Sequence, residues 1–169
     1  LPPEGDGRYI CAGRFVSAAK EVGLNMNNFT QVLNTVHGKQ HRYWRIGTRD
    51  GSDSYWPMMH ERDCIAIGWT ALGDLSWVET KKASREKLKE LIHEKHPSSP
   101  QAEGKTVLQI AQFIATIGEG DIIWAADEAK ILGIGRVTGE YRLEPDFDFP
   151  HQRPVEWLNL KEWKMPVHE

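Results

Sequence analysis

The sequence predicts an α+β fold in which a small, curved, barrel-like β-sheet is flanked by helices and preceded by a short helical hairpin. Helical periodicity is confined to residues 8–38 and to the middle of the chain, whereas the last third is a series of strand patterns joined by turns. The chain has no internal repeat and no low-complexity tract. We therefore divide it into a disordered lead with a helical hairpin, residues 1–40, and one α+β domain, residues 41–169.

The composition is that of an ordinary globular domain. Of 169 residues, 40% are hydrophobic and 27% are charged, and the net charge of −3 excludes a generally basic nucleic-acid coat. The two cysteines, Cys11 and Cys64, make no disulfide framework, so we expect a reducing, cytoplasmic location. No apolar run approaches the roughly 20 residues that span a bilayer, and the polar first residues do not resemble a signal peptide, so we expect no membrane partner.

The first half of the chain predicts a helical hairpin, two strands and a short helix. Apolar residues recur at helical spacing in the hairpin: Phe15, Ala18 and Val22, then Phe29, Leu33 and Val36. Residues 42–47 alternate as a strand, and residues 48–53 have turn chemistry. A short helix is predicted over 54–62, a buried strand over 64–69 and a loop over 70–76.

The second half predicts two helices followed by strands. Ser84 is expected to cap a helix over residues 85–94, and a second apolar helix is predicted over 105–117, ending at Gly118. Three strands follow, over residues 121–125, 130–141 and 153–158. An acidic and aromatic loop over 141–152 precedes the last of them.

No pattern in the sequence requires a cofactor or a metal. Gly133 and Gly135 lie inside a strand pattern with no helix after them, so they do not form a phosphate-binding loop. His37 and His41 flank Gly38, which breaks the helix that such a metal-binding pair needs. We therefore expect no cofactor, no metal and no catalytic residue, and a binding module rather than an enzyme.

Two groups of segments resemble a known family when they are taken in order. The first is Tyr43-Trp44-Arg45-Ile46, Tyr55-Trp56, Ile65-Ala66-Ile67-Gly68-Trp69 and Leu72-Gly73-Asp74-Leu75. The second is Gly120-Asp121-Ile122-Ile123, the stretch from Ile131 to Gly139, and Arg153-Pro154-Val155-Glu156-Trp157. They resemble the EVE-like domains of the PUA superfamily, which are related to the YTH readers, and in particular those at the N-terminus of McrB-type modification-dependent restriction GTPases. The resemblance covers residues 41–169.

This resemblance implies a small β-barrel with a pocket that accepts a flipped, often methylated base. In the YTH relatives an aromatic cage holds the methyl group, and one cage wall stands in a context similar to Ile67-Gly68-Trp69. Further walls come from the loop before the last strand, which here contains Tyr141, Phe147 and Phe149. The expected base pocket comprises Trp69, Thr70, Asp74, Trp56, Tyr141 and Phe149.

The resemblance also implies a place in a larger system. It implies a DNA-binding specificity module of an antiphage restriction system, whose partners are DNA carrying a modified base, an AAA+ GTPase motor and a nuclease subunit. Two alternatives remain open: a PUA-type RNA-binding module, and a small ASCH-like nucleic-acid-processing enzyme using Lys130, Glu128 or Asp74. Whether the base is N6-methyladenine, 5-methylcytosine or 5-hydroxymethylcytosine is also open.

Strand alternation gives an independent reason to place Trp69 at a pocket. Ile65, Ile67 and Trp69 share one face, and Trp69 stands where the strand meets a polar loop. An indole at such a rim stacks on a base, which is worth roughly 1–3 kcal/mol, and Asp74 is placed to accept a hydrogen bond from an exocyclic amine. Two plainer interpretations stay open: Trp69 as a core residue and Asp74 as a turn cap. Of the other tryptophans, we expect Trp44, Trp124 and Trp157 in the core and Trp163 as a lid.

Two basic clusters are candidates for contacts with the phosphate backbone. They comprise Arg42, Arg45 and Arg49 around the first strand, and Lys81, Lys82 and Arg85 before the first long helix. A helix start favours phosphate, and a polar loop suits backbone contacts. The alternative for each cluster is an ordinary solvated surface.

Overall fold

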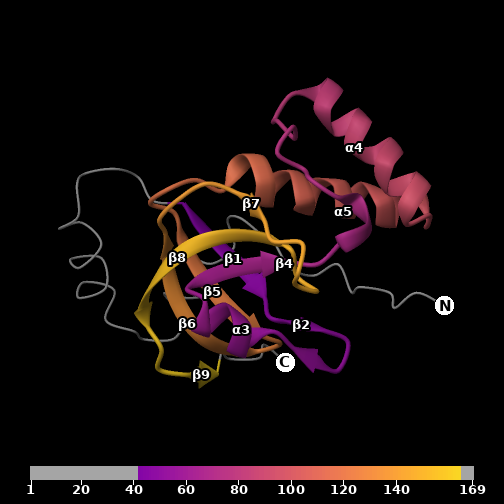
Figure 1. The fold of residues 1–169 in the computed structure, drawn as a ribbon. Helices are drawn as coiled ribbons and strands as arrows, with labels where there is room; N and C mark the ends of the chain where they lie inside the picture. Colours follow the sequence, from indigo (N-terminus) through magenta and orange to yellow (C-terminus); the bar gives the residue numbers. More distant parts are fainter. Residues whose placement is uncertain (1–41, 165–169) are drawn as a thin grey trace.

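A computed structural model of the protein describes residues 42–164 (Figure 1). The predicted lead and helical hairpin of residues 1–40 lie outside the described residues, as do His37 and His41. Within the described range the fold is α+β, with a curled mixed sheet that forms a half-barrel and a few helices. The predicted class, a curved barrel-like sheet with flanking helices, is confirmed at this level.

The half-barrel is one seven-stranded sheet. Its main path runs in the order β1, β5, β6, β8 and β4, which are Tyr43–Gly47, Ile122–Asp127, Lys130–Val137, His151–Asn159 and Cys64–Ile67. Only β1 and β5 are parallel among the paired strands of this sheet. Two short strands lie off this path: β7 (Arg142–Leu143) pairs with β8, and β9 (Trp163–Lys164) pairs with β6. This is not the all-parallel order of a doubly wound fold.

The curved sheet contains two irregularities of strand register and two close contacts between a glycine and a tryptophan ring. The register shifts between Ala125 and Ala126 of β5 and again between Ile134 and Gly135 of β6. Such bulges bend a strand and increase its twist. A Cβ on Gly133 would lie 2.7 Å from the Trp56 ring, and one on Gly135 would lie 3.0 Å from the Trp157 ring. These glycines therefore let two indoles pack directly against the bent strand.

Helices cover the two faces of the sheet. Helices α4 (Lys82–Lys95) and α5 (Pro100–Ala111) lie together on one side in Figure 1, and their apolar residues join the largest core cluster. The short helix α3 (Trp56–Glu61) packs on the other face of β4, where Met59 contacts Ala66 and Phe149. No helix within residues 42–164 combines the length and apolar character needed to cross a membrane.

Helix α4 begins before the predicted start, and Ser84 is not its cap. The helix starts at Lys82, and the Ser84 hydroxyl instead accepts a hydrogen bond from the Glu79 backbone N–H at 2.8 Å. The first turn of this helix is polar and largely solvent-exposed. Apolar periodicity therefore does not predict this first turn.

Helix α5 also begins earlier than predicted and changes type near its end. It starts at Pro100, where proline suits the first helical turn, and the Ser99 side chain accepts a hydrogen bond from the Ala102 N–H at 3.3 Å. From Gln112 to Thr116 the chain forms a π-helical turn, η2, rather than a regular α-helix. The predicted end near residue 117 is correct, but the predicted start at 105 and the uniform helix are not.

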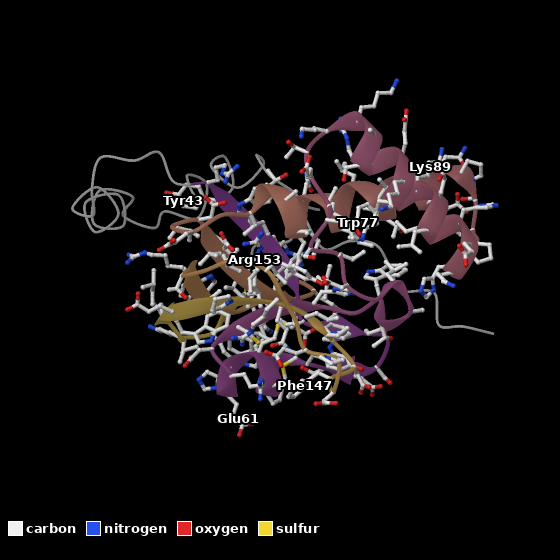
Figure 2. The ribbon with its side chains drawn as sticks, turned by 45° about the horizontal axis from the view of Figure 1, so that its top comes forward. Tyr43, Glu61, Trp77, Lys89, Phe147 and Arg153 are labelled. Atoms are coloured by element: carbon white, nitrogen blue, oxygen red, sulfur yellow. The ribbon has the colours of Figure 1, made fainter. Side chains whose placement is uncertain are left out.

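A buried arginine donates hydrogen bonds to backbone carbonyl oxygens at the end of this helix. The Arg153 guanidinium of β8 donates to the backbone oxygens of Phe113 at 2.8 Å, Ile114 at 2.5 Å and Gly139 at 3.2 Å. The last carbonyls of a helix have no partner within the helix. Figure 2 shows Arg153 near the centre of the molecule, where β8 meets the helices. Arg153 is therefore a structural cation.

The shorter elements refine the predicted strands and loops. The predicted strand over 130–141 ends at Val137, and the predicted loop over 141–152 contains β7 and the start of β8. The predicted turn over 48–53 includes most of a small hairpin, β2 (Arg49–Asp50) and β3 (Asp53–Ser54). Hydrogen bonds across the sheet decide these boundaries, and no local pattern encodes them.

The tryptophans divide between core and surface largely as predicted. Trp44 and Trp124 are 3% and 9% exposed, which confirms both as core residues. Trp163 is half-buried and packs, as a lid would, against what we call the second core cluster: Ile122, Trp124, Ala126, Ile131 and Ile134. Trp157 is half-buried rather than core, and it packs both against the largest core cluster and against the cluster of Met59, Ala66 and Phe149.

Candidate functional site

The chain reverses sharply where β4 ends, and this reversal presents Trp69. Trp69 has φ 71° and ψ 39°, in the left-handed region. A bulky residue rarely adopts this conformation, which costs on the order of 1–3 kcal/mol and persists only where the surroundings enforce it. A 3₁₀ turn, η1 (Thr70–Leu72), follows, and Gly73 at φ 65° completes the reversal. We call residues 68–76 the Trp69 loop.

The Trp69 ring is half-buried. One part packs against the largest core cluster, and the His96 ring meets it edge-on at a centroid distance of 5.1 Å and an interplanar angle of 86°. His96 directly follows α4, at its C-cap. The indole therefore combines a buried part with a part that faces solvent, as a residue at the rim of the core does.

A tyrosine–histidine pair holds both ends of the Trp69 loop. The Tyr141 hydroxyl lies 2.9 Å from His151 Nδ1, and His151 Nε2 lies 3.2 Å from the Trp69 carbonyl oxygen. The same Tyr141 oxygen accepts a hydrogen bond from the Leu75 backbone N–H at 3.2 Å. One pair of side chains thus connects Trp69, near the start of the loop, to Leu75, near its end.

The chemistry of these groups determines where each proton lies. A carbonyl oxygen only accepts, so His151 Nε2 carries a proton and donates to Trp69. In a neutral imidazole Nδ1 is then unprotonated, and it accepts from the Tyr141 hydroxyl. Burial lowers the pKa of His151 and raises the pKa of Tyr141, so the neutral forms that this arrangement needs are the favoured ones.

Sequence reasoning did not select either histidine of this site. His151 shares a face of β8 with Arg153 and Val155, and this alternation indicates burial but names no partner. His96 reaches Trp69 because α4 packs beside η1, a tertiary contact with no local signal. Only the folded arrangement identifies them as neighbours of Trp69.

Asp74 closes its own turn. Its Oδ1 accepts from the Ser76 N–H at 2.9 Å, and its Oδ2 accepts from the Ser76 hydroxyl at 3.0 Å. Trp77 Nε1 donates to the Asp74 backbone oxygen at 3.1 Å, and the Lys87 ammonium lies 4.3 Å from the Trp77 ring centroid. Asp74 is thus a turn cap, although its exposed carboxylate oxygens retain lone pairs for a second partner. Thr70 is exposed at the start of η1.

The structure separates the predicted pocket residues into two groups. Trp69, Thr70, Asp74 and Tyr141 come together around the Trp69 loop. Trp56 and Phe149 belong to the cluster on the opposite face of β4, because successive strand residues point to opposite faces. There Phe149 stacks on Tyr55 with ring centroids 3.8 Å apart, and Trp56 meets Trp157 edge-on at 4.9 Å. In Figure 2, Trp77 lies near α4 and α5, while Phe147 and Glu61 lie at the other end of the molecule.

Most of the predicted phosphate-contacting side chains have partners within the protein. The ion pairs are Arg42–Asp121 at 3.1 Å, Arg49–Asp127 at 2.7 Å, Lys81–Glu79 at 2.8 Å and Lys82–Glu86 at 3.6 Å, and Arg45 donates to the Glu128 carbonyl. Pairs at the surface are weak and screened by salt, so they compete only modestly with a phosphate. The exposed Arg85 side chain forms no ion pair within residues 42–164.

The residues named for the enzymatic alternative lie apart. Glu128, at φ 52°, and Lys130, paired with Glu162 at 2.5 Å, stand at the turn between β5 and β6. Asp74 lies near Tyr141, beyond the other end of β6, and an eight-residue strand spans about 26 Å. Across the described part of the chain, no three His, Cys, Asp or Glu side chains are placed to hold a metal ion. Burial raises the pKa of Cys64 to about 11, which keeps this thiol protonated.

Comparison with known proteins returned one family. The model described as "Domain of unknown function (DUF8426)" matches residues 44–169, a range that includes the Trp69 loop and the Tyr141–His151 pair. No curated protein and no solved structure gives a significant match to the chain.

Proposed function

The chain belongs to the DUF8426 family of domains of unknown function, and from the chemistry of its site we propose that it is a DNA-binding module that recognises a modified base. The base is flipped from the duplex and stacks on Trp69. Membership of the EVE-like group of the PUA superfamily is part of this proposal. So are its partners, an AAA+ GTPase motor and a nuclease subunit of a McrB-type restriction system.

The observation that carries the proposal is the conformation of Trp69. Trp69 is a large, half-buried aromatic residue that follows β4, and its backbone is left-handed. The fully buried His151 donates a hydrogen bond to the Trp69 carbonyl oxygen. Strain of this kind gathers at ligand sites, whereas a residue that only fills the core has no need of it. A base stacked on the exposed part of the indole gains roughly 1–3 kcal/mol.

Polar groups of the same loop suit the reading of a base edge. The exposed Asp74 carboxylate accepts hydrogen bonds, as the exocyclic amine of adenine or cytosine requires, and the exposed Thr70 hydroxyl both donates and accepts. Phe149 supports the loop from behind, since a Cβ on Gly68 would lie 3.4 Å from its ring. We therefore assign Trp69, Thr70 and Asp74 to base contact and Phe149 to support of the loop, whereas Trp56 packs against Trp157 and Gly133, away from the loop.

The charge of the protein favours specificity over general affinity for DNA. A net charge of −3 and cations that mostly have acidic partners leave few groups to release counterions from a duplex. Binding of plain DNA is accordingly weak, and the base pocket supplies most of the preference.

Trp69→Ala in the full chain tests the proposal. The affinity for a duplex with one modified base should fall by about one to two orders of magnitude, because the stacking contribution is lost. Weak binding to plain duplex persists on phosphate contacts. Fluorescence anisotropy measures this with matched duplexes carrying N6-methyladenine, 5-methylcytosine, 5-hydroxymethylcytosine or no modification, and with single-stranded RNA of the same sequence.

Trp163→Ala is the matched control, because Trp163 is also half-buried but packs against a different core cluster. Thermal melting of both variants separates loss of binding from loss of folding. The proposal fails if Trp69→Ala leaves the preference for a modified duplex unchanged, or if Trp163→Ala reduces that preference equally. Tighter binding of the RNA than of every modified duplex would favour the RNA-binding alternative.

A further inference from the structure

We infer that Tyr141 and His151 are positioning residues for base recognition, which orient Trp69 through its backbone without touching the base. The inference rests on the proposed function. It concerns two residues that come from outside the Trp69 loop, one from just before β7 and one from the start of β8.

The pair ties the Trp69 loop to the sheet at both ends. Hydrogen bonds inside the loop are local, from the Leu72 N–H to the Trp69 oxygen at 3.0 Å and from the Gly73 N–H to the Thr70 oxygen at 3.3 Å. Such turns set the shape of the loop but not its orientation. The bonds from His151 to Trp69 and from Leu75 to Tyr141 connect that shape to the sheet.

His151 donates its hydrogen bond to the Trp69 carbonyl oxygen, which is the atom that would move if the strained backbone relaxed. If residue 69 rotated from the left-handed region to an ordinary one, its carbonyl would turn away from His151 Nε2. The same rotation would carry the indole away from the His96 ring. The His151 hydrogen bond therefore opposes the relaxation. A strained backbone persists only where such contacts from the surrounding structure enforce it.

The polar atoms of the pair are engaged within the protein. His151 is 0% exposed, and both of its ring nitrogens have partners within the protein. The Tyr141 hydroxyl donates to His151 and accepts from Leu75. The Tyr141 ring is half-buried, but its hydroxyl has both of its partners within the protein, so removing this hydroxyl acts on the connection to Trp69 and Leu75.

A double-mutant cycle tests this route. Tyr141→Phe removes one hydroxyl and keeps the ring, and we make it in the native chain and in the Trp69→Ala chain. The probe is whichever of the three modified duplexes the native protein binds most tightly. In the native chain the affinity should fall about two- to tenfold, as expected for one neutral hydrogen bond. In the Trp69→Ala chain it should not fall further, since the two changes act on one group.

Tyr43→Phe is the control, because Tyr43 is half-buried and packs against the second core cluster. It should change affinity in neither background. Amide hydrogen exchange measured by NMR without DNA provides the second readout. Tyr141→Phe should speed exchange of the Leu75 N–H, which loses its acceptor, while Tyr43→Phe should not.

The outcomes distinguish this inference from the proposed function. If Trp69→Ala abolishes the preference for modified DNA but Tyr141→Phe has no effect, or has the same effect in both backgrounds, the inference alone is wrong. Unchanged exchange at Leu75 in Tyr141→Phe also overturns it. If Trp69→Ala leaves the preference intact, the proposed function fails and the inference fails with it.

Discussion

His151 illustrates how one buried side chain links local geometry to stability. Its ring lies in the core, between the Trp69 carbonyl and the Tyr141 hydroxyl, and burial disfavours the charged form of the ring. The unfolded chain has no such restriction. Protonation of this histidine therefore favours unfolding.

We expect the free energy of unfolding to fall as the pH drops below about 6.5, the ordinary pKa of histidine. Burial lowers the pKa of His151 in the folded state, so the unfolded state binds more protons between the two pKa values. The stabilisation is complete above the unfolded pKa and is lost as the pH falls towards the folded one. The slope from this one group is at most about 1.4 kcal/mol per pH unit.

Urea unfolding across this pH range measures the slope. His151→Gln keeps an amide donor for Trp69 but cannot titrate, so its slope should be shallower than that of the native protein. Equal slopes in the native protein and His151→Gln would contradict the assignment of a neutral buried ring.

At the level of elements, polar capping contacts hold the connection between α4 and α5, in addition to the apolar packing of the two helices. Ser99 caps α5, and the buried Glu103 one turn later accepts from the Ser98 N–H at 3.0 Å and lies 2.9 Å from His93 Nδ1. The hydrogen bond from Ser98, together with His93, lowers the pKa of Glu103. These contacts hold the start of α5 against the end of α4.

Ser99→Ala should lower the free energy of unfolding by about 1 kcal/mol, the usual contribution of a helix N-cap. Ser98→Ala is the control, because Ser98 uses its backbone N–H and not its side chain in the contact with Glu103. Chemical denaturation of both variants measures the difference. A loss in Ser98→Ala as large as that in Ser99→Ala would show that the cap is not the source.

At the scale of the whole molecule, the distribution of charge limits how DNA is held. Acidic residues outnumber basic ones, 24 to 21, and ion pairs occupy most of the basic candidates. Arg85 on α4 is exposed and forms no ion pair among the described residues, whereas Arg49 is held by Asp127 and by the Ser52 carbonyl. Phosphate contacts are therefore expected to depend more on Arg85.

Arg85→Ala should weaken binding of modified and plain duplexes equally and reduce the salt slope by about 0.9 if it neutralises one phosphate. Arg49→Ala should have the same kind of effect but a smaller one, because its guanidinium is already paired. Titrations at several salt concentrations measure both quantities. A loss confined to modified duplexes would place the substituted residue in the base pocket instead.

Local sequence patterns predict the class of fold and most of the elements. Alternation and apolar runs identified β1, β4, β5, β6 and β8, and periodicity identified the apolar turns of α4 and α5, because these signals depend on which face of an element is buried. Trp69 packs against the cluster that contains Ile65, as predicted, but β4 ends at Ile67, so Trp69 lies in a left-handed turn and not at the end of a strand over 64–69. These patterns do not predict the polar first turns of the helices, the π-helical turn or β7, because hydrogen bonds rather than burial define those elements.

Tertiary structure decided which of the candidate residues meet. Tyr141 joins the Trp69 loop, while Trp56 and Phe149 pack on the opposite face of β4, although all three were predicted for one pocket. His151 and His96 come from segments far from Trp69 in sequence, and only the curl of the sheet and the packing of α4 bring them to it. The left-handed backbone of Trp69 also depends on tertiary contacts. A conformation that its own residue disfavours is held by partners elsewhere in the chain, so no local pattern encodes it.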